Sequence, residues 1–156
     1  MIMTDEKCLY LRSAVLADAM LLFQWRNEKA TRANSLHSEE LVYEDHVHWL
    51  ERVLEIDKTR YFYILMKGNM PIGQIRLCED NEMMLISYSV DVSHRGRGYG
   101  RTILQMLEEK LSEQNAPFVL VGYVKQENIA SQRAFISLGY CEGRENNLFR
   151  YEKRIG

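Results

Sequence analysis

Apolar and polar residues repeat with two different periods along the first third of the chain. Over residues 7–12 they alternate one by one, which predicts a strand. Over 16–28 and again over 43–56, apolar side chains recur at the spacing of one helix face, which predicts two amphipathic helices. The chain is therefore expected to begin with a strand followed by two helices.

The middle of the chain is rich in β-branched and aromatic residues, which favour strands. Two such runs, 61–67 and 72–78, enclose the turn sequence Gly-Asn at 68–69 and predict a hairpin. Asp-Asn at 80–81 then turns the chain into a further strand over 85–92.

The last third continues the mixture of helices and strands. Leucine and isoleucine recur at helical spacing over 103–111, until Asn-Ala-Pro at 115–117 ends the helix. A strand over 118–124, a helix over 128–138 and a closing hairpin over 140–154 follow. This order of elements predicts a mixed α/β fold.

The segment 95–100, Arg-Gly-Arg-Gly-Tyr-Gly, lies between the predicted strand over 85–92 and the helix after it. Glycine has no Cβ and adopts positive φ at little cost, so the backbone N–H groups of such a segment can approach an anion closely. The helix that follows directs the positive end of its dipole at the same point. The segment is therefore predicted to bind a pyrophosphate.

Two common phosphate-binding patterns do not fit this segment. Gly96, Gly98 and Gly100 are spaced at two, unlike the G-x-G-x-x-G of dinucleotide-binding folds, and no Gly-Lys-Ser/Thr follows as in a P-loop. Its arginines could instead form a solvated basic face or contact a nucleic acid. However, 20 basic and 22 acidic residues give the chain a net charge of -2, so the chain has no overall positive field to attract a nucleic acid. A small anionic ligand, bound by a few local arginines, fits this charge better.

The pattern that does fit is R-x-x-G-x-G, matched by Arg95, Gly98 and Gly100. In this respect the chain resembles the GNAT superfamily of acetyl-CoA-dependent N-acetyltransferases, in which this motif wraps the pyrophosphate of coenzyme A. A second pattern of that family follows downstream: an asparagine, a small residue, an aromatic residue and then Gly-aromatic. It is matched by Asn128, Ser131, Phe135, Gly139 and Tyr140.

The resemblance implies one GNAT domain over 1–156, a mixed α/β fold with a mostly antiparallel sheet of about seven strands flanked by about four helices. It implies acetyl-CoA as the cofactor. The loop N–H groups would bind the pyrophosphate, the neighbouring strand would bind the pantetheine arm, and an N–H near Ser89 would bind the thioester oxygen. The residues implied to contact coenzyme A are Val90, Val92, Arg95, Gly96, Arg97, Gly98, Tyr99, Gly100, Arg101, Asn128 and Ser131.

The acid and the base of the reaction are where the chain departs from the family pattern. Many members have a tyrosine where this chain has Phe135, which has no proton to give to the leaving thiolate. Tyr123 and Tyr140 are possible substitutes. A glutamate that is often found early in the preceding strand would fall at 84–85, which is apolar here, so Glu82 is the nearest candidate base.

The N-terminal region is expected to select the acceptor. It contains Trp-Arg-Asn at 25–27, His37 and His-Val-His-Trp-Leu at 46–50. In these residues it resembles the subgroup that acetylates UDP-linked 4-amino-4,6-dideoxy sugars, as in pseudaminic acid synthesis. A protein N-terminal amine, as in the ribosomal-protein branch, is the alternative acceptor. Tryptophans at apolar helical positions, as Trp25 and Trp49 are, more often belong to the core, and His46 and His48 point to different helix faces, which disfavours a metal pair. The implied acceptor-binding residues are Trp25, Arg26, Asn27, His46, Trp49 and Tyr88.

The overall composition indicates the cellular location and argues against two kinds of cysteine site. No run approaches the roughly 20 apolar residues that a membrane span needs, and the first residues are acidic where a signal peptide is basic, so a cytoplasmic protein is expected. The three cysteines are scattered, which argues against disulfides and a metal site. The sequence leaves open a homodimer and, as a function of another class, a sensor that binds acyl-CoA without turnover.

Overall fold

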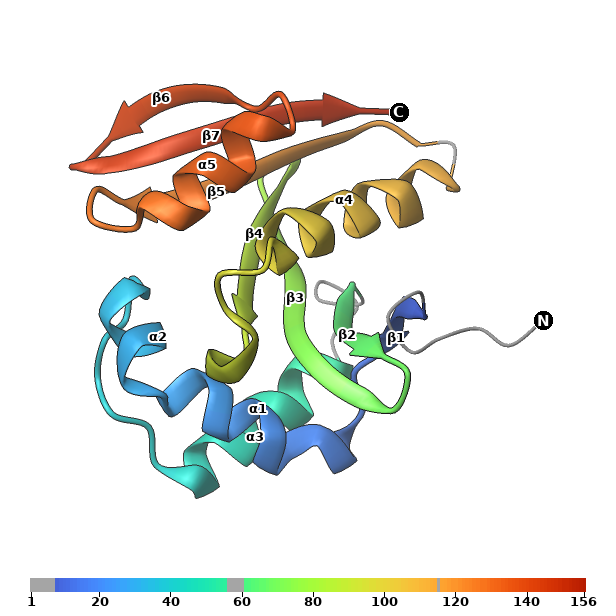
Figure 1. Cartoon of the computed structure of the whole chain (residues 1–156), viewed down its shortest axis with the longest axis vertical. Helices are drawn as coiled ribbons and strands as arrows, with labels where there is room; N and C mark the ends of the chain where they lie inside the picture. The colour runs from blue at the N-terminus through green and yellow to red at the C-terminus, as the bar shows by residue number, and fades with distance from the viewer. Residues whose placement is uncertain (1–7, 56–60, 115) are drawn as a thin grey trace.

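The computed structural model describes residues 8–55, 61–114 and 116–156, which form one seven-stranded sheet and five α-helices (Figure 1). The strands are β1 (Leu9–Ser13), β2 (Phe62–Lys67), β3 (Met70–Asp80), β4 (Met83–Val90), β5 (Phe118–Lys125), β6 (Cys141–Glu145) and β7 (Leu148–Ile155). The helices are α1 (Ala19–Asn27), α2 (Lys29–Asn34), α3 (Tyr43–Glu55), α4 (Tyr99–Ser112) and α5 (Ile129–Ser137).

The sheet has the strand order β1-β2-β3-β4-β5-β7-β6. Every neighbouring pair is antiparallel except β4 and β5, which are parallel. The predicted mixed α/β fold and mostly antiparallel sheet are therefore confirmed.

Two hydrophobic cores lie on opposite faces of the sheet. Alternate residues of β2 enter different cores: Tyr63 and Leu65 pack on the side of α4 and α5, whereas Phe62 and Ile64 pack on the side of α1 and α3. This division explains why β2 is a continuous apolar run, since both of its faces are covered.

β4 and β5 separate soon after they meet. Their parallel pairing consists of Met84 with Leu120 and Leu85 with Val121, and both strands continue beyond these pairs. In Figure 1, β4 runs down the view while β5 runs across it. The sheet is thus divided into a part with β1–β4 and a part with β5–β7, and an opening lies between the diverging strands.

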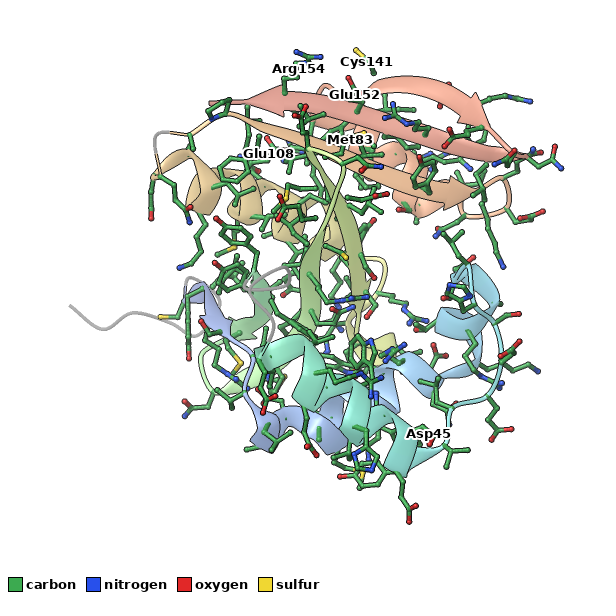
Figure 2. The ribbon with its side chains drawn as sticks, turned by 180° about the vertical axis from the view of Figure 1, so that it is seen from behind. Asp45, Met83, Glu108, Cys141, Glu152 and Arg154 are labelled. Atoms are coloured by element: carbon green, nitrogen blue, oxygen red, sulfur yellow. The ribbon has the colours of Figure 1, made fainter. Side chains whose placement is uncertain are left out.

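The helices α1–α3 and the strands β5–β7 lie at opposite ends of the molecule (Figure 2). Asp45 of α3 lies at one end, and Cys141 of β6 and Arg154 of β7 lie at the other. Met83, the first residue of β4, lies at the second end as well, where its Sδ is 3.2 Å from Nη2 of Arg150. β4 therefore leads from the β6–β7 end towards the helices α1–α3.

Two short helices depart from the predicted pattern. The predicted strand over 85–92 ends at Val90, and a 3-10 helix over Val92–His94 follows because the Asp91 carboxylate accepts from the N–H of Ser93 at 3.1 Å and caps it. In the same way the Glu28 side chain caps α2, a helix that was not predicted. Lys7 and Ile56, at the ends of two predicted elements, lie outside the described residues.

Candidate active site

A cleft of about 920 Å³ opens where β4 and β5 separate. Because successive strand residues point to opposite faces, both faces of the sheet contribute to its walls. The side facing α4 and α5, called the α4 side here, includes Tyr88, Gly98, Gly100 and Ser131. The side facing α1 and α3, called the α3 side, includes Arg26, Trp49 and Arg76. The volume is within the roughly 300–1,000 Å³ that small-molecule sites occupy.

The predicted phosphate-binding segment forms the turn into α4. Gly96 and Gly98 have φ of 78° and 80°, in the left-handed region that glycine adopts most easily. A Cβ at either position would meet none of the described heavy atoms within 4 Å, so the space beside the turn is open. Gly98 is also the N-cap of α4 and has no side chain to occupy the first N–H groups of this helix. The turn can therefore offer these N–H groups to an anion.

Arg95 ties this turn to the N-terminal helices. Its Nη2 donates to Glu28 Oε2 at 3.0 Å and to Thr31 Oγ1 at 2.8 Å, and its Nε donates to the Val90 carbonyl at 3.0 Å. Burial alone would raise the pKa of Glu28, but hydrogen bonds from Thr31, Ala30 and Arg95 lower it to about 2. The Arg95 side chain is therefore already paired, and the Val90 carbonyl is already used.

Asp91 anchors the beginning of the same turn. Its carboxylate accepts from Trp25 Nε1 at 2.8 Å, from His94 Nδ1 at 3.1 Å and from the hydroxyl of Ser93. Burial alone would raise the pKa of Asp91, but hydrogen bonds from Ser93, Trp25 and His94 lower it to about 2. Trp25 itself is buried in the core between α1, α3 and β2, outside the cleft, so its indole positions the turn.

On the α4 side, two hydroxyl groups meet at the cleft. Tyr88 of β4 and Ser131 of α5 are joined by a hydrogen bond of 2.8 Å between Oη and Oγ. The hydroxyl of Tyr88 also lies 3.5 Å from the place where a Cβ on Gly100 would be, so it reaches the first turn of α4. Burial raises the pKa of Tyr88, which keeps the phenol protonated. Asn128 caps α5 by accepting from the N–H of Ser131 at 3.3 Å.

Phe135 is a packing residue next to these hydroxyls. It is 2% exposed, stacks on Tyr151 with ring centroids 5.1 Å apart, and meets Tyr140 edge-on at 4.9 Å. A Cβ on Gly122 would lie 2.3 Å from its Cζ, so the ring fits only because position 122 is glycine. Tyr140 belongs to this cluster and lies outside the cleft, where burial and the charge of Glu108 raise its pKa.

On the α3 side, the cleft has a polar and cationic wall. Gln74 and Ser89 face each other across β3 and β4, with Nε2 donating to Oγ at 3.1 Å. Arg26 and Arg76 lie over the ring of Trp49, with their Cζ atoms 4.0 and 4.9 Å from its centroid. The wall therefore carries positive charge.

Residues 9–140 match the family model described as the acetyltransferase (GNAT) domain. The chain belongs to the GNAT acetyltransferase family. A sequence search of the curated proteins finds no match.

Solved structures agree with this membership at the level of the GNAT fold. Spermidine N-acetyltransferase from Vibrio cholerae, in complex with CoA and spermine, superposes with a TM-score of 0.80 at 14% identity, covering 94% of each chain. AAC(6')-Ib in complex with ribostamycin and coenzyme A has a TM-score of 0.77 at 18% identity, covering 94% of this chain and 92% of that one. An acetyltransferase from Thermus thermophilus has a TM-score of 0.73 at 23% identity, covering 94% of this chain and 97% of that one.

Most residues assigned to coenzyme A in this GNAT domain line the cleft, and two do not. Val92 follows the end of β4 and is 57% exposed, because the strand stops two residues before it. Arg97 is exposed on the outside of the turn. The assigned residues that line the cleft are Val90, Arg95, Gly96, Gly98, Tyr99, Gly100, Arg101, Asn128 and Ser131.

The assigned catalytic and acceptor-binding residues divide similarly. Tyr123, Tyr88, Arg26 and Trp49 line the cleft. Glu82 lies at the tight turn between β3 and β4, exposed, with φ of 71°, and does not reach the cleft.

Asn27 and His46 also lie outside the cleft, where each accepts a hydrogen bond from a residue that lines it. The Asn27 Oδ1 accepts from the N–H of Leu41 at 2.9 Å. The buried His46 accepts from Arg26 Nη1 at its Nδ1, at 3.3 Å, and donates from Nε2 to the Ala19 carbonyl at 3.1 Å.

Sequence reasoning missed the part of the site that comes from β3. The run 72–78 predicts a strand, and its polar residues Gln74 and Arg76 alternate with the buried Ile75 and Leu77. This alternation was a usable signal, because it marks one face of the strand as polar. No group of three or more His, Cys, Asp or Glu side chains suited to a metal occurs in the described ranges, and no helix there is long and apolar enough to cross a membrane.

Proposed function

We propose that this protein transfers the acetyl group of acetyl-CoA directly to a primary amine. One observation carries the proposal: the glycine turn and the first N–H groups of α4 open onto a cleft that continues between β4 and β5. The turn can bind the pyrophosphate, and the unpaired edge of β4 can bind the extended pantetheine arm. The structures of the V. cholerae enzyme and of AAC(6')-Ib each contain coenzyme A, which supports the same cofactor here.

The cleft suits a reaction in which the two substrates approach from opposite faces of the sheet. The thioester comes from the α4 side and the amine from the α3 side, so they meet between β4 and β5. The neutral amine attacks the thioester carbon, the C–N bond forms, and the C–S bond breaks. The nitrogen loses a proton to solvent, and the coenzyme A thiolate takes one from a donor in the cleft.

We assign Tyr88 as that proton donor, in place of the tyrosine that Phe135 replaces. Its hydroxyl lies on the α4 side between the first turn of α4 and Ser131 of α5. Burial raises its pKa, so the phenol is protonated and can donate to the sulfur as the C–S bond breaks. Tyr123 is the alternative donor: its pKa is raised by hydrogen bonding to Glu145 and by burial, and it lines the same cleft from β5.

For the acceptor we propose a UDP-linked 4-amino-4,6-dideoxy sugar. Among the described residues of the cleft lining, Arg26 and Arg76 lie on the α3 side, and Glu39 is the one carboxylate of the whole lining. Such a wall favours an amine that carries negative charge over the polycation spermine, which the V. cholerae enzyme binds. The resemblance of the sequence at 25–27 and 46–50 to the amino-sugar subgroup favours the same choice.

Thiol release from acetyl-CoA with a panel of acceptors tests the proposal. The UDP-linked amino sugar should give turnover, whereas peptides that begin with Ser or Ala, and spermidine, should give little. Turnover with the peptides alone would overturn the choice of acceptor. If acetyl-CoA raises the melting temperature but no acceptor releases thiol, the chain is an acyl-CoA sensor and the catalytic proposal is wrong.

A further inference from the structure

The α3 side of the cleft contains a charged side chain that nothing in the described protein neutralises. Arg76 projects from β3 on the face opposite to Ile75 and Leu77, which are buried in the core beneath α4. Its side chain is half-buried and makes no hydrogen bond or ion pair with any described residue; its guanidinium lies over the rings of Trp49 and Phe62. Burial lowers its pKa, because desolvation disfavours the charged form.

A second arginine lies on the same indole. The Cζ of Arg26, from α1, is 4.0 Å from the centroid of the Trp49 ring, closer than that of Arg76. Burial and repulsion by Arg76 lower the pKa of Arg26 to about 10. Its one hydrogen bond to a described side chain goes to the neutral His46, so this guanidinium also lacks a carboxylate partner.

Two arginines elsewhere in the described chain, Arg12 and Arg95, are by contrast each paired with a carboxylate. Arg12 pairs with Asp18 at 2.8 Å, and Arg95 pairs with Glu28 at 3.0 Å. Two unpaired, partly desolvated positive charges placed together destabilise the free protein. An anion bound between them would remove that cost, and the planar guanidinium fork matches the oxygen atoms of a phosphate.

The position of the two arginines separates them from the coenzyme A site. Tyr88 and Gly100 lie on the α4 side, whereas Arg76 pairs in register with Ser87 and points to the α3 side. Because a guanidinium covers the Trp49 ring, that face of the ring supports the arginine and is not open for stacking on a sugar or a base.

We propose that Arg26 and Arg76, held on Trp49, form a phosphate-binding subsite for the acceptor, so that the amine to be acetylated carries a phosphate or diphosphate group. The assignment rests on the proposed function, since it takes the α3 side as the place where the amine enters. His46 is a positioning residue for this subsite, because it accepts from Arg26 and is fixed by its own bond to the Ala19 carbonyl.

Calorimetric titration of UDP and of inorganic pyrophosphate into the protein saturated with coenzyme A tests the subsite. Saturation keeps the glycine turn filled, so the probes report on a second anion site. Arg26→Met and Arg76→Met should each weaken UDP at least about tenfold, and the double variant should abolish its binding. The matched control is Arg52→Met, which removes an exposed charge of α3 outside the cleft and should leave the UDP affinity unchanged.

Thermal unfolding separates binding from a structural role. Arg76→Met should melt no lower than the wild type, because an unpaired half-buried charge is replaced by an apolar chain of similar length. A clear fall in its melting temperature would mean that Arg76 is needed for folding and would overturn the assignment. The assignment would also be overturned if UDP failed to bind the coenzyme A complex or displaced coenzyme A from it. Equal UDP affinity in Arg26→Met, Arg76→Met and the wild type would overturn it as well. Coenzyme A that fails to bind at all would instead refute the proposed function.

Discussion

Gly98 and Gly139 form a matched pair for testing where the pyrophosphate binds. Both have left-handed backbone conformations, with φ of 80° and 86°, and at both positions a Cβ would meet no described heavy atom within 4 Å. Gly98 is the N-cap of α4 at the cleft, whereas Gly139 follows α5 outside it. Changing either to glutamate therefore introduces the same backbone strain and the same charge, but only one of them at the proposed ligand site.

The strain of an L-residue in this region lowers the free energy of unfolding by about 1–2 kcal/mol in both variants. For a domain of this size that corresponds to a fall of roughly 2–8 °C in melting temperature. At position 98 the new carboxylate would stand about 6 Å from a pyrophosphate charge, and at an effective dielectric constant of about 20 the repulsion is about 3 kcal/mol. We therefore expect the Kd for coenzyme A to rise about 100-fold in Gly98→Glu.

Isothermal calorimetry with coenzyme A, together with thermal unfolding of both variants, measures the two effects separately. Gly139→Glu should bind coenzyme A as the wild type does while melting as low as Gly98→Glu. A Kd for Gly98→Glu within about threefold of the wild type would refute the placement of the pyrophosphate at this turn. Equal loss of affinity in both variants would show that the effect comes from reduced stability.

Three further predictions concern other parts of the structure. Tyr88→Phe should lower kcat about 100-fold and leave the Kd for coenzyme A unchanged, and Tyr123→Phe should change kcat little; the reverse result would exchange their roles. Gly122→Ala would place a Cβ 2.3 Å from Cζ of Phe135, so urea unfolding should show a loss of about 1–3 kcal/mol that Phe135→Leu partly restores. Because the pKa of Glu28 is lowered from 4.5 to about 2, its ionised carboxylate stabilises the fold at pH values above 4.5, and this contribution is lost as the pH falls towards 2. The difference in the free energy of unfolding between the wild type and Glu28→Gln should therefore shrink between these two pH values.

The sequence by itself determined the order of the strands and of the longer helices, the fold family and the glycine turn. These features are local, because periodicity follows from which face of one element is buried, and the positive φ of Gly96 and Gly98 depends on residues within the turn. The same reasoning missed α2 and extended β4 as far as Val92, because the caps at Glu28 and Asp91 act through side chains that suit several conformations.

The tertiary structure alone decided which of the candidate side chains meet. The sequence implies that Trp25 contacts the acceptor, but its indole donates to Asp91, 66 residues away. It implies that Arg95 binds the coenzyme through its backbone N–H, and only the structure shows that the Arg95 side chain pairs with Glu28, 67 residues away. Arg76 of β3 meets Arg26 of α1 at the ring of Trp49 because α1 and α3 pack on the face of the sheet to which Arg76 points. Such contacts depend on strand register and on how helices lie across a sheet, and neither of these can be derived from the spacing of residues within one element.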